Sequence, residues 1–229
     1  MAMLGPIMDI YTRRRVGGTA NLDALTGPVV LVANHSSHMD TPTILRSLPR
    51  RFRRRTAVAA AADYFYASRR RAATVSLAFN TVPIQRHGGG LAPASTRHVD
   101  RLFTDGWSLL VFAEGTRSRD GSVGRLRSGA AVLAAEHGLP LVPVHISGTH
   151  AAMPAGQSWP RRQAGRLRGR RHPIEVRFGP PIHRREGEDR LALMERVRLF
   201  LAEAGAATTA PDQRVVGAPA ADRAGQETG

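Results

Sequence analysis

The sequence predicts a single α/β domain with a mostly parallel central sheet flanked by helices. Short apolar runs of strand length alternate with amphipathic segments of helix length along most of the chain. Polar loops directly follow several of the apolar runs. A parallel sheet gathers such loops at one edge, which is where α/β proteins usually place their functional groups. A length of 229 residues suits one domain with a sizeable core.

The strands are predicted from runs of apolar residues. Val29 to Ala33 is a continuous apolar run, as expected of a strand that is buried on both faces. Proline is disfavoured in a central strand, so we expect a bend or bulge at Pro143. The other predicted strands are Thr56 to Ala60, Thr81 to Arg86, Trp107 to Phe112, Leu139 to Ile146 and Ile174 to Phe178.

The helices are predicted from apolar spacing and from residues that begin or end helices. In the first helix, Thr41 is placed to cap the N-terminus and Pro42 is tolerated in the first turn. In the last helix, apolar residues at Leu191, Met194, Val197 and Leu201 define one face. The predicted helices are Pro42 to Leu48, Ser68 to Phe79, Ser95 to Phe103, Leu126 to His137 and Asp189 to Ala204.

Three regions are predicted along the chain. Residues 1–28 form a lead-in, whose first ten residues could make a short helix that touches a membrane. Residues 29–205 form the main domain. Residues 206–229 are rich in Ala, Gly and Pro and are predicted to be a disordered tail.

Composition narrows the possible partners and chemistry. The chain has no Cys, which excludes disulfides, thiol catalysis and Cys-based zinc sites. Its formal net charge is +15, and all of its basic residues other than His are Arg. Such a surface implies an anionic partner: nucleic acid, an anionic membrane or a phosphorylated substrate. No apolar run approaches the ~18–20 residues of a membrane span, so we expect a cytoplasmic protein.

The loop after the first predicted strand carries His35 and Asp40, five positions apart. A histidine whose ring is held by a carboxylate can take a proton from a hydroxyl group. The loop lacks a convincing nucleophile, since no Gly-x-Ser-x-Gly turn surrounds its serines. We therefore favour a base that acts on a bound hydroxyl. A capping Asp beside a structural His, or a metal site that includes His38, are the alternatives.

Two other predicted strands are also followed by polar residues. Arg86 ends one strand, and Glu114-Gly115-Thr116-Arg117 follows another. Arg86 and Arg117 could clamp a phosphate, although either could instead form an ordinary salt bridge. Glu114 is better suited to orient a group, or to bind a substrate hydroxyl, than to act as a second base. A histidine base beside a phosphate clamp fits acyl transfer to a phosphorylated acceptor.

Four blocks of this sequence resemble the glycerolipid acyltransferase superfamily, whose type member is the bacterial PlsC enzyme. The blocks are Asn34-His35 with Asp40, Ile84-Gln85-Arg86, Phe112-Ala113-Glu114-Gly115-Thr116-Arg117-Ser118 and Val142-Pro143-Val144. The first and third are specific, and the order and separation of all four agree with the family. The resemblance spans Val29 to Ile182, and it implies the fold of the glycerol-3-phosphate acyltransferases.

The resemblance also implies a reaction. The family histidine, matched by His35, takes the proton of the acceptor hydroxyl while Asp40 orients it. The hydroxyl then attacks the thioester of acyl-CoA or acyl carrier protein without an acyl-enzyme. These thioesters are co-substrates, and no bound cofactor or metal is expected. By the same resemblance, the residues expected to bind the acceptor phosphate are Arg86, Glu114, Gly115, Thr116 and Arg117. Those expected to line the acyl or donor channel are Val142, Pro143 and Val144.

The sequence departs from the family at a few positions. Asn80 stands where Gly is usual, Ala113 replaces the usual Pro, and the stretch from Ala59 to Asp63 lacks a common Lys. The N-terminal helical anchor is short or missing. We therefore expect peripheral attachment to the inner face of the cell membrane through basic patches, with Arg50 to Arg55 and Arg161 to Arg171 as candidates.

The leading hypothesis is transfer of a fatty acyl group to a lysophosphatidate-like acceptor in phospholipid synthesis. One alternative keeps the chemistry but changes the acceptor to a glycolipid, a sugar or a polyol. A nucleic-acid-binding protein is disfavoured, because the chain lacks a binding motif and interleaved aromatic residues. An inactive scaffold is disfavoured by the intact His35 and Asp40.

Overall fold

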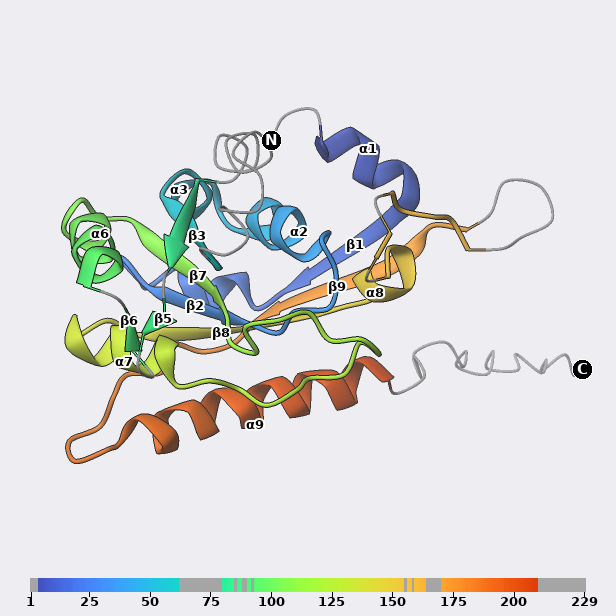
Figure 1. The fold of residues 1–229 in the computed structure, drawn as a ribbon. Coiled ribbons are helices and arrows are strands. Elements are labelled where there is room, and N and C mark those ends of the chain that lie inside the picture. The colour runs from blue at the N-terminus through green and yellow to red at the C-terminus, as the bar shows by residue number, and fades with distance from the viewer. Residues whose placement is uncertain are drawn as a thin grey trace, which may run out of the picture.

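The chain folds around a seven-stranded sheet in a computed structural model (Figure 1). The structure describes residues 4–61, 80–84, 86–87, 90–91, 93–154, 156–157, 159–163 and 170–209. The strand order is β1-β9-β8-β2-β7-β3-β4. The strands are β1 Thr12–Gly17, β2 Val30–Ala33, β3 Thr56–Ala61, β4 Thr81–Ile84, β7 Ser108–Phe112, β8 Leu141–Ser147 and β9 His172–Phe178. A separate antiparallel ribbon joins β5 Arg86–His87 to β6 Gly90–Leu91.

Most neighbouring strands run parallel, which confirms the predicted α/β fold with a mostly parallel sheet. β2 lies between β7 and β8 and is parallel to both. β3 is parallel to β4 and β7, and β1 is parallel to β9. Only the β8–β9 pair of this sheet is antiparallel. The carboxyl ends of β7, β2 and β8 therefore meet at one edge of the sheet.

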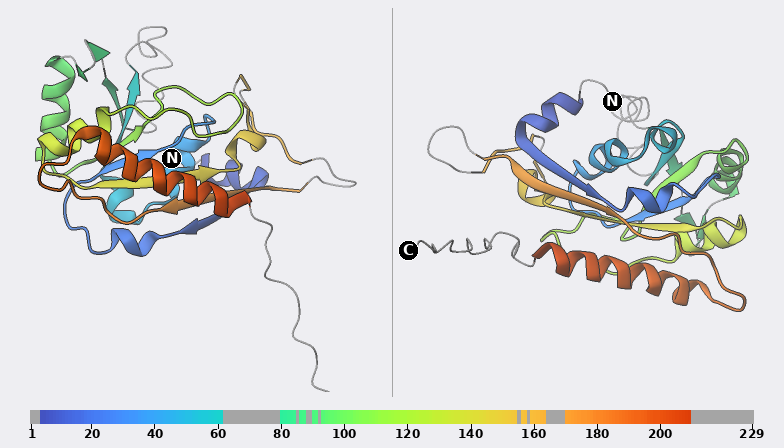
Figure 2. Two further views of the ribbon diagram at one scale, coloured as in Figure 1. Left: turned by 90° about the horizontal axis from the view of Figure 1, so that it is seen from below. Right: turned by 180° about the vertical axis from the view of Figure 1, so that it is seen from behind.

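Helices cover both faces of the sheet (Figure 2). α2 Asp40–Ser47 and α3 Arg50–Arg54 lie on one face, and the long α9 Arg190–Thr209 runs along the other. Since β-strand side chains alternate between faces, Leu31 packs with the α2 layer while Val30 packs with the α9 layer. The remaining helices are α1 Leu4–Tyr11, the 3-10 helix η1 Thr19–Leu22, α6 Pro93–Thr104, α7 Gly129–Glu136 and α8 Thr149–Ala152.

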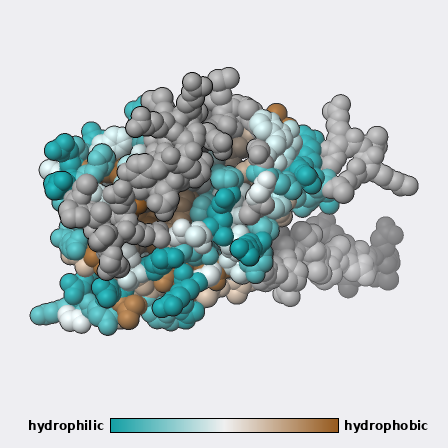
Figure 3. Space-filling model, in the orientation of Figure 1, coloured by the Kyte–Doolittle hydropathy of each residue, from teal (hydrophilic) through white to brown (hydrophobic). Residues whose placement is uncertain are grey.

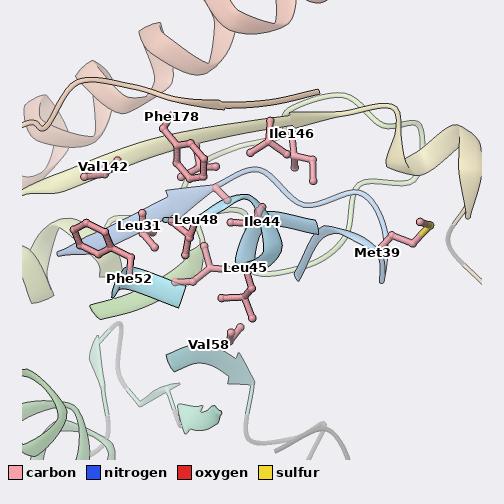
Figure 4. Close-up of a cluster of buried hydrophobic side chains, with 14 of the residues drawn as sticks. Leu31, Met39, Ile44, Leu45, Leu48, Phe52, Val58, Val142, Ile146 and Phe178 are labelled. Carbon is pink, nitrogen blue, oxygen red and sulfur yellow. The ribbon is translucent and has the colours of Figure 1, made fainter. Parts of the chain in front are cut away.

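The α2 layer holds the first loop in place through an apolar core (Figure 4). Ile44 of α2 and Leu48, directly after this helix, are buried among Leu31, Val142 and Phe178 of the sheet. Burial of such side chains stabilises the fold by about 1.5–3 kcal/mol each. The helix that follows the His35 loop is thereby fixed against the strand that precedes it.

The lead-in at residues 1–28 is not separate from the domain, so that predicted boundary is wrong. β1 pairs with β9 along its whole length, from Thr12 with His172 to Gly17 with Arg177. Leu22 is fully buried. At the other end, α9 continues to Thr209, so residues 206–209 are helical and not tail. The rest of the predicted tail, like the predicted helix from Ser68 to Phe79, lies outside the described residues.

Smaller predictions within the elements met different outcomes. α2 begins at Asp40 with Met39 at the N-cap, so Thr41 is not the cap. Leu191 is 67% exposed, and Leu193 takes its place on the buried face of α9. The bend or bulge expected in the strand at Pro143 does not lie in β8, which keeps a continuous register with β2 through Pro143. β8 pairs with β9 at Val144–Phe178 and with the chain beyond β9 at Leu141–Ile182, which leaves one extra residue on the partner side.

Candidate active site

The candidate site lies at the sheet edge where β2, β7 and β8 end. Asn34 fixes the first loop to this edge. Its side-chain amide donates to the carbonyl of Ile146 at 2.9 Å, and its side-chain carbonyl accepts the Ile146 N–H at 2.8 Å. Asn34 is buried, so both bonds are protected from water. The start of the His35 loop is therefore tied to the end of β8.

Asp40 holds the ring of His35, as the sequence predicted. Its Oδ2 lies 2.8 Å from Nδ1 of His35. The same oxygen accepts the N–H groups of Ser36 and Ser37 at 2.7 and 2.8 Å. Asp40 has no exposed surface, and a buried carboxylate is stable only when it is well hydrogen-bonded. The aspartate thus fixes both the imidazole and the loop that carries it.

His35 is positioned to offer its second ring nitrogen. An ionised Asp40 can only accept, so Nδ1 of a neutral His35 carries the proton and Nε2 is unprotonated. The imidazole stacks on Phe112 of β7 with a centroid separation of 3.9 Å and an interplanar angle of 19°. The ring remains 18% exposed, and no residue in the described ranges is hydrogen-bonded to Nε2. This arrangement suits a general base.

Glu114 holds the His35 loop in place through two backbone hydrogen bonds. Its Oε1 accepts the backbone N–H of His35 at 2.8 Å, and its Oε2 accepts the N–H of Gly124 at 2.9 Å. Both oxygens of the buried carboxylate are therefore engaged, and its charge would repel a phosphate. Of the two roles predicted for Glu114, these contacts favour the orienting role over the phosphate contact. The Ser118 N–H also donates to the His35 carbonyl, at 2.8 Å.

Arg117 reaches across to the first loop. Its guanidinium donates a hydrogen bond to Nε2 of His38, and its side chain is partly exposed. Partial burial, and secondarily the Arg117 charge, keep the pKa of His38 below its ordinary value. The sequence offered His38 only as part of an alternative metal site, and its contact with Arg117 joins residues 79 positions apart. Within the described ranges, no three His, Asp or Glu side chains gather as a metal would require.

The other residues predicted to bind the phosphate, Gly115, Thr116 and Arg86, differ in whether their polar groups are available to an anion. The N–H of Gly115 is used within its turn, where it donates to the Phe112 carbonyl at 3.1 Å, so this N–H does not point at an anion. Gly115 has a φ of +75°, which favours glycine. Thr116 is exposed. The backbone of Arg86 begins β5, but its side chain lies outside the described structure.

The two departures from the family sequence fit their local backbone. Asn80 has a φ of +48°, in the left-handed region where Gly is best tolerated and Asn is the next choice. Ala113 donates its N–H to the Ala33 carbonyl at 3.0 Å, a bond that Pro would lack. Both changes therefore keep the backbone path. Asp63, in the stretch without the usual Lys, lies outside the described residues.

The predicted donor channel is wrong for Val142, Pro143 and Val144. All three residues are buried, and both valines have no exposed surface. Val142 and Val144 pack in the core beneath α2. They support the sheet edge from within, and they line no open channel.

Thr149 belongs to the site, although the sequence reasoning missed it. Its Oγ1 lies 2.5 Å from Oδ1 of Asp40, and the residue is fully buried. Thr149 follows β8 directly, after Ser147 and Gly148. The rule that polar residues after parallel strands gather at one edge also applies to this loop and could have found it.

Within the described ranges, no helix has the length and apolar character needed to cross a membrane. On the face shown in Figure 3, the described residues are mostly hydrophilic, with small hydrophobic patches between them.

Comparison with known proteins identifies the family. The chain is 32% identical over 160 residues to the chloroplastic 1-acyl-sn-glycerol-3-phosphate acyltransferase BAT2 of Brassica napus, which covers 68% of this chain and 44% of that protein. It is 34% identical over 119 residues to the 1-acyl-sn-glycerol-3-phosphate acyltransferase of Pseudomonas aeruginosa, covering 51% and 42%. The chain thus spans less than half the length of these relatives.

A solved structure has the same fold. It is the 1-acyl-sn-glycerophosphate acyltransferase PlsC from Thermotoga maritima, with a TM-score of 0.61 and 24% identity over 85% of this chain and 73% of that one. A model of the Acyltransferase family matches residues 13–147, which begin in β1, end in β8 and include His35, Asp40 and Glu114. With more than half of its length matched, and with the resemblance of its four blocks confirmed, this chain belongs to the Acyltransferase family.

Proposed function

We propose that this protein transfers a fatty acyl group from a thioester, acyl-CoA or acyl carrier protein, to the free hydroxyl of a lysophosphatidate-like acceptor. The observation that carries the proposal is the His35–Asp40 pair. Asp40 holds Nδ1 at 2.8 Å, and Nε2 has no hydrogen-bond partner among the described residues. The relatives named above as acylglycerol-phosphate acyltransferases support the choice of acceptor.

His35 acts as the general base in this reaction. Its Nε2 takes the hydroxyl proton while the hydroxyl oxygen attacks the thioester carbonyl carbon. The resulting tetrahedral intermediate collapses as the carbon–sulfur bond breaks and its electron pair goes to sulfur. The imidazolium, stabilised by Asp40, returns the proton to the thiolate. The products are an ester and a free thiol, and no acyl-enzyme forms.

Arg117 is the group best suited to the acceptor phosphate. An arginine fork binds phosphate oxygens in pairs, and Arg117 is partly exposed on a loop that is bonded to the His35 backbone. Both carboxylate oxygens of Glu114 accept backbone N–H groups, so this carboxylate does not form an ion pair with Arg117 that a phosphate would have to displace. Arg86 remains a proposed partner on the basis of its place in the second block.

The acceptor is a lipid, so the protein is proposed to work at an anionic membrane surface, on the inner face of the cell membrane. Arg50, Arg53 and Arg54 of α3 are exposed and would contribute ~1 kcal/mol each close to such a surface. Phe52, the one apolar residue between Arg50 and Arg55, is buried and cannot insert into the membrane. The attraction would therefore be electrostatic and would weaken with salt.

The test is an acyl-transfer assay on the purified protein with labelled acyl-CoA or acyl carrier protein. Acceptors are lysophosphatidate, the matching monoacylglycerol without phosphate, a glycolipid and a polyol, with products read by mass spectrometry. We expect product from lysophosphatidate and a loss of about 10²–10⁴-fold in kcat for His35→Ala, the usual contribution of a general base. Full activity of His35→Ala would refute the mechanism, and exclusive use of an unphosphorylated acceptor would refute the substrate.

The chain supplies a matched control for this variant. His137 forms a second His–Asp pair, with its Nε2 3.1 Å from Asp100 between α7 and α6. His137→Ala removes the same kind of pair away from the sheet edge. It is expected to leave acyl transfer unchanged, and a loss equal to that of His35→Ala would mean that neither loss is specific to the site.

A further inference from the structure

Asp40 has a second hydrogen-bond partner outside its own loop. His35 and the Ser36 and Ser37 N–H groups all use Oδ2. The other oxygen, Oδ1, lies 2.5 Å from the hydroxyl of Thr149. Thr149 is the first residue of α8 and comes from the end of β8, 109 positions away in the chain. Both residues have no exposed surface.

The direction of this hydrogen bond follows from the donors available. An ionised carboxylate only accepts, so the Thr149 hydroxyl must donate its single hydrogen to Asp40. The Oγ atoms of Thr149 and Ser36 are 3.2 Å apart. With the Thr149 hydrogen already used, Ser36 must donate to Thr149. A short chain of hydroxyl groups therefore ends on the Asp40 oxygen that His35 does not use.

The backbone before Thr149 is shaped for this contact. Gly148 has a φ of +82°, and a Cβ there would lie 2.0 Å from the backbone oxygen of Pro173. Only glycine can make this turn without moving β9. The turn sets Thr149 immediately after β8, which pairs directly with β2. The pairing of β8 with β2 therefore brings the Thr149 hydroxyl to Asp40.

We propose that Thr149 is a positioning residue for the His35–Asp40 pair. This inference rests on the proposed acyl transfer. A carboxylate can rotate about its Cβ–Cγ bond, and donors on both oxygens prevent that rotation. Thr149 thereby keeps Oδ2 directed at Nδ1 of His35.

The test compares Thr149→Val, which keeps the shape but removes the hydroxyl, with Thr149→Ser, which keeps the hydroxyl. We expect Val to lower kcat about tenfold to a hundredfold, which is the loss seen when the hydrogen-bond partners of metal-binding side chains are removed, with KM changed less than about twofold. We also expect the acid limb of its pH–rate profile to move to lower pH, because a carboxylate that can turn away from Nδ1 stabilises the imidazolium less. Ser should restore most of kcat and the original profile.

Two other threonines provide matched controls. Thr43 is buried, and its hydroxyl has no hydrogen-bond partner among the described residues. Thr56 is buried and donates to the Phe52 carbonyl at 2.7 Å, away from the site. Thr43→Val removes a buried hydroxyl alone, and Thr56→Val removes a buried hydrogen bond alone. Neither variant should change kcat or the pH profile. If both variants lose activity as Thr149→Val does, the effect at Thr149 is nonspecific.

The proposal is wrong if Thr149→Val keeps the wild-type kcat and pH profile, or if Thr149→Ser is as impaired as Val. If Thr149→Val does not fold, Thr149→Cys takes its place. Because a thiol is a weak donor, the kcat of Thr149→Cys should be lower than that of Thr149→Ser but still measurable. The ¹⁵N chemical shifts of the His35 ring provide a readout without substrate. Thr149→Val should reduce the fraction protonated on Nδ1, and an unchanged spectrum would refute the positioning role even if the wild-type protein shows no acyl transfer.

Discussion

Glu114 accepts the backbone N–H of His35 at 2.8 Å, although 79 residues separate the two in the chain. The bond joins the loop after β7 to the loop after β2. On the same loop, Ser118 donates to the His35 carbonyl, so both backbone polar groups of the proposed base are held from outside its own loop. The Glu-Gly-Thr-Arg-Ser block therefore holds the proposed base in place and also carries Arg117, the proposed phosphate ligand.

Replacing Glu114 should destabilise the fold and impair catalysis together. Glu114→Ala leaves the N–H groups of His35 and Gly124 without their acceptor, at about 1–3 kcal/mol for each if water does not replace it. Glu114→Gln keeps one acceptor and sets an NH₂ group against the other N–H, so its loss should be smaller. Urea denaturation and kcat measure the two effects. Glu136→Ala, on the exposed face of α7, is the control, and equal effects from it would contradict this role.

Local sequence was enough to single out His35 and Asp40 as candidates, because Asp40 begins the helix directly after the His35 loop and their spacing lets the side chains meet. The contacts of Asn34 with Ile146 and of Asp40 with Thr149 were not predictable in this way, since they depend on β8 pairing beside β2. The parallel sheet and its central strands were predicted because buried parallel strands are continuously apolar.

The failures have equally physical causes. β1 was missed because Thr12–Gly17 carries three consecutive arginines and reads as a polar segment, yet as an edge strand it needs only one strand neighbour. Val142 and Val144 were assigned to a channel by resemblance alone, whereas a strand paired on both sides and covered by α2 has its side chains in the core.

The contact between Arg117 and His38 should be visible in the titration of His38. Its pKa is lowered by partial burial first and by the Arg117 charge second. Arg117→Gln removes the second cause, so the pKa of His38 should rise but remain below its ordinary value. NMR titration of the His38 ring measures this. Arg119→Gln, two residues along the same loop and exposed, should leave the titration unchanged. No rise in Arg117→Gln would mean that the two side chains do not meet in solution.

Arg117→Gln should also separate phosphorylated from unphosphorylated acceptors. Loss of a charged hydrogen-bond donor to phosphate is expected to raise KM for lysophosphatidate about tenfold to a hundredfold. Monoacylglycerol carries no phosphate, so its kinetics should change little. Initial rates with both acceptors, with Arg119→Gln as the matched variant, decide the matter. An equal loss for both acceptors would assign Arg117 to the structure of the loop and not to phosphate recognition.

Gly148→Ala should disrupt the turn after β8. The substitution forces a side chain into a left-handed conformation, at about 1–2 kcal/mol, and sets Cβ against the Pro173 carbonyl. Loss of stability should therefore exceed that strain alone, and kcat should fall because Thr149 is displaced from Asp40. Thermal unfolding and kcat are the measurements. Gly129→Ala, where a Cβ meets nothing within 4 Å, is the control and should be tolerated. Full activity of Gly148→Ala would show that the turn can adapt.

Two buried histidines away from the proposed base should make the fold sensitive to acid. His145 on β8 and His172 on β9 are buried, and Nδ1 of each has no partner among the described residues. Burial lowers the pKa of both, and for His145 the nearby Glu175 and Arg177 act in opposite directions as smaller effects. Because the unfolded chain takes up protons at higher pH than the folded one, both histidines favour unfolding as acid is added.

The sign of the effect sets the pH window. Stability is complete above the ordinary histidine value of about 6.5 and falls as pH drops toward the lowered folded pKa, by about 1.4 kcal/mol per pH unit for each histidine that titrates. In His145→Leu combined with His172→Leu, the free energy of unfolding should vary less between pH 7 and pH 5. Urea denaturation across this range measures it. His183→Leu, at an exposed position, should keep the wild-type slope, and a double variant with that same slope would exclude these histidines as the cause.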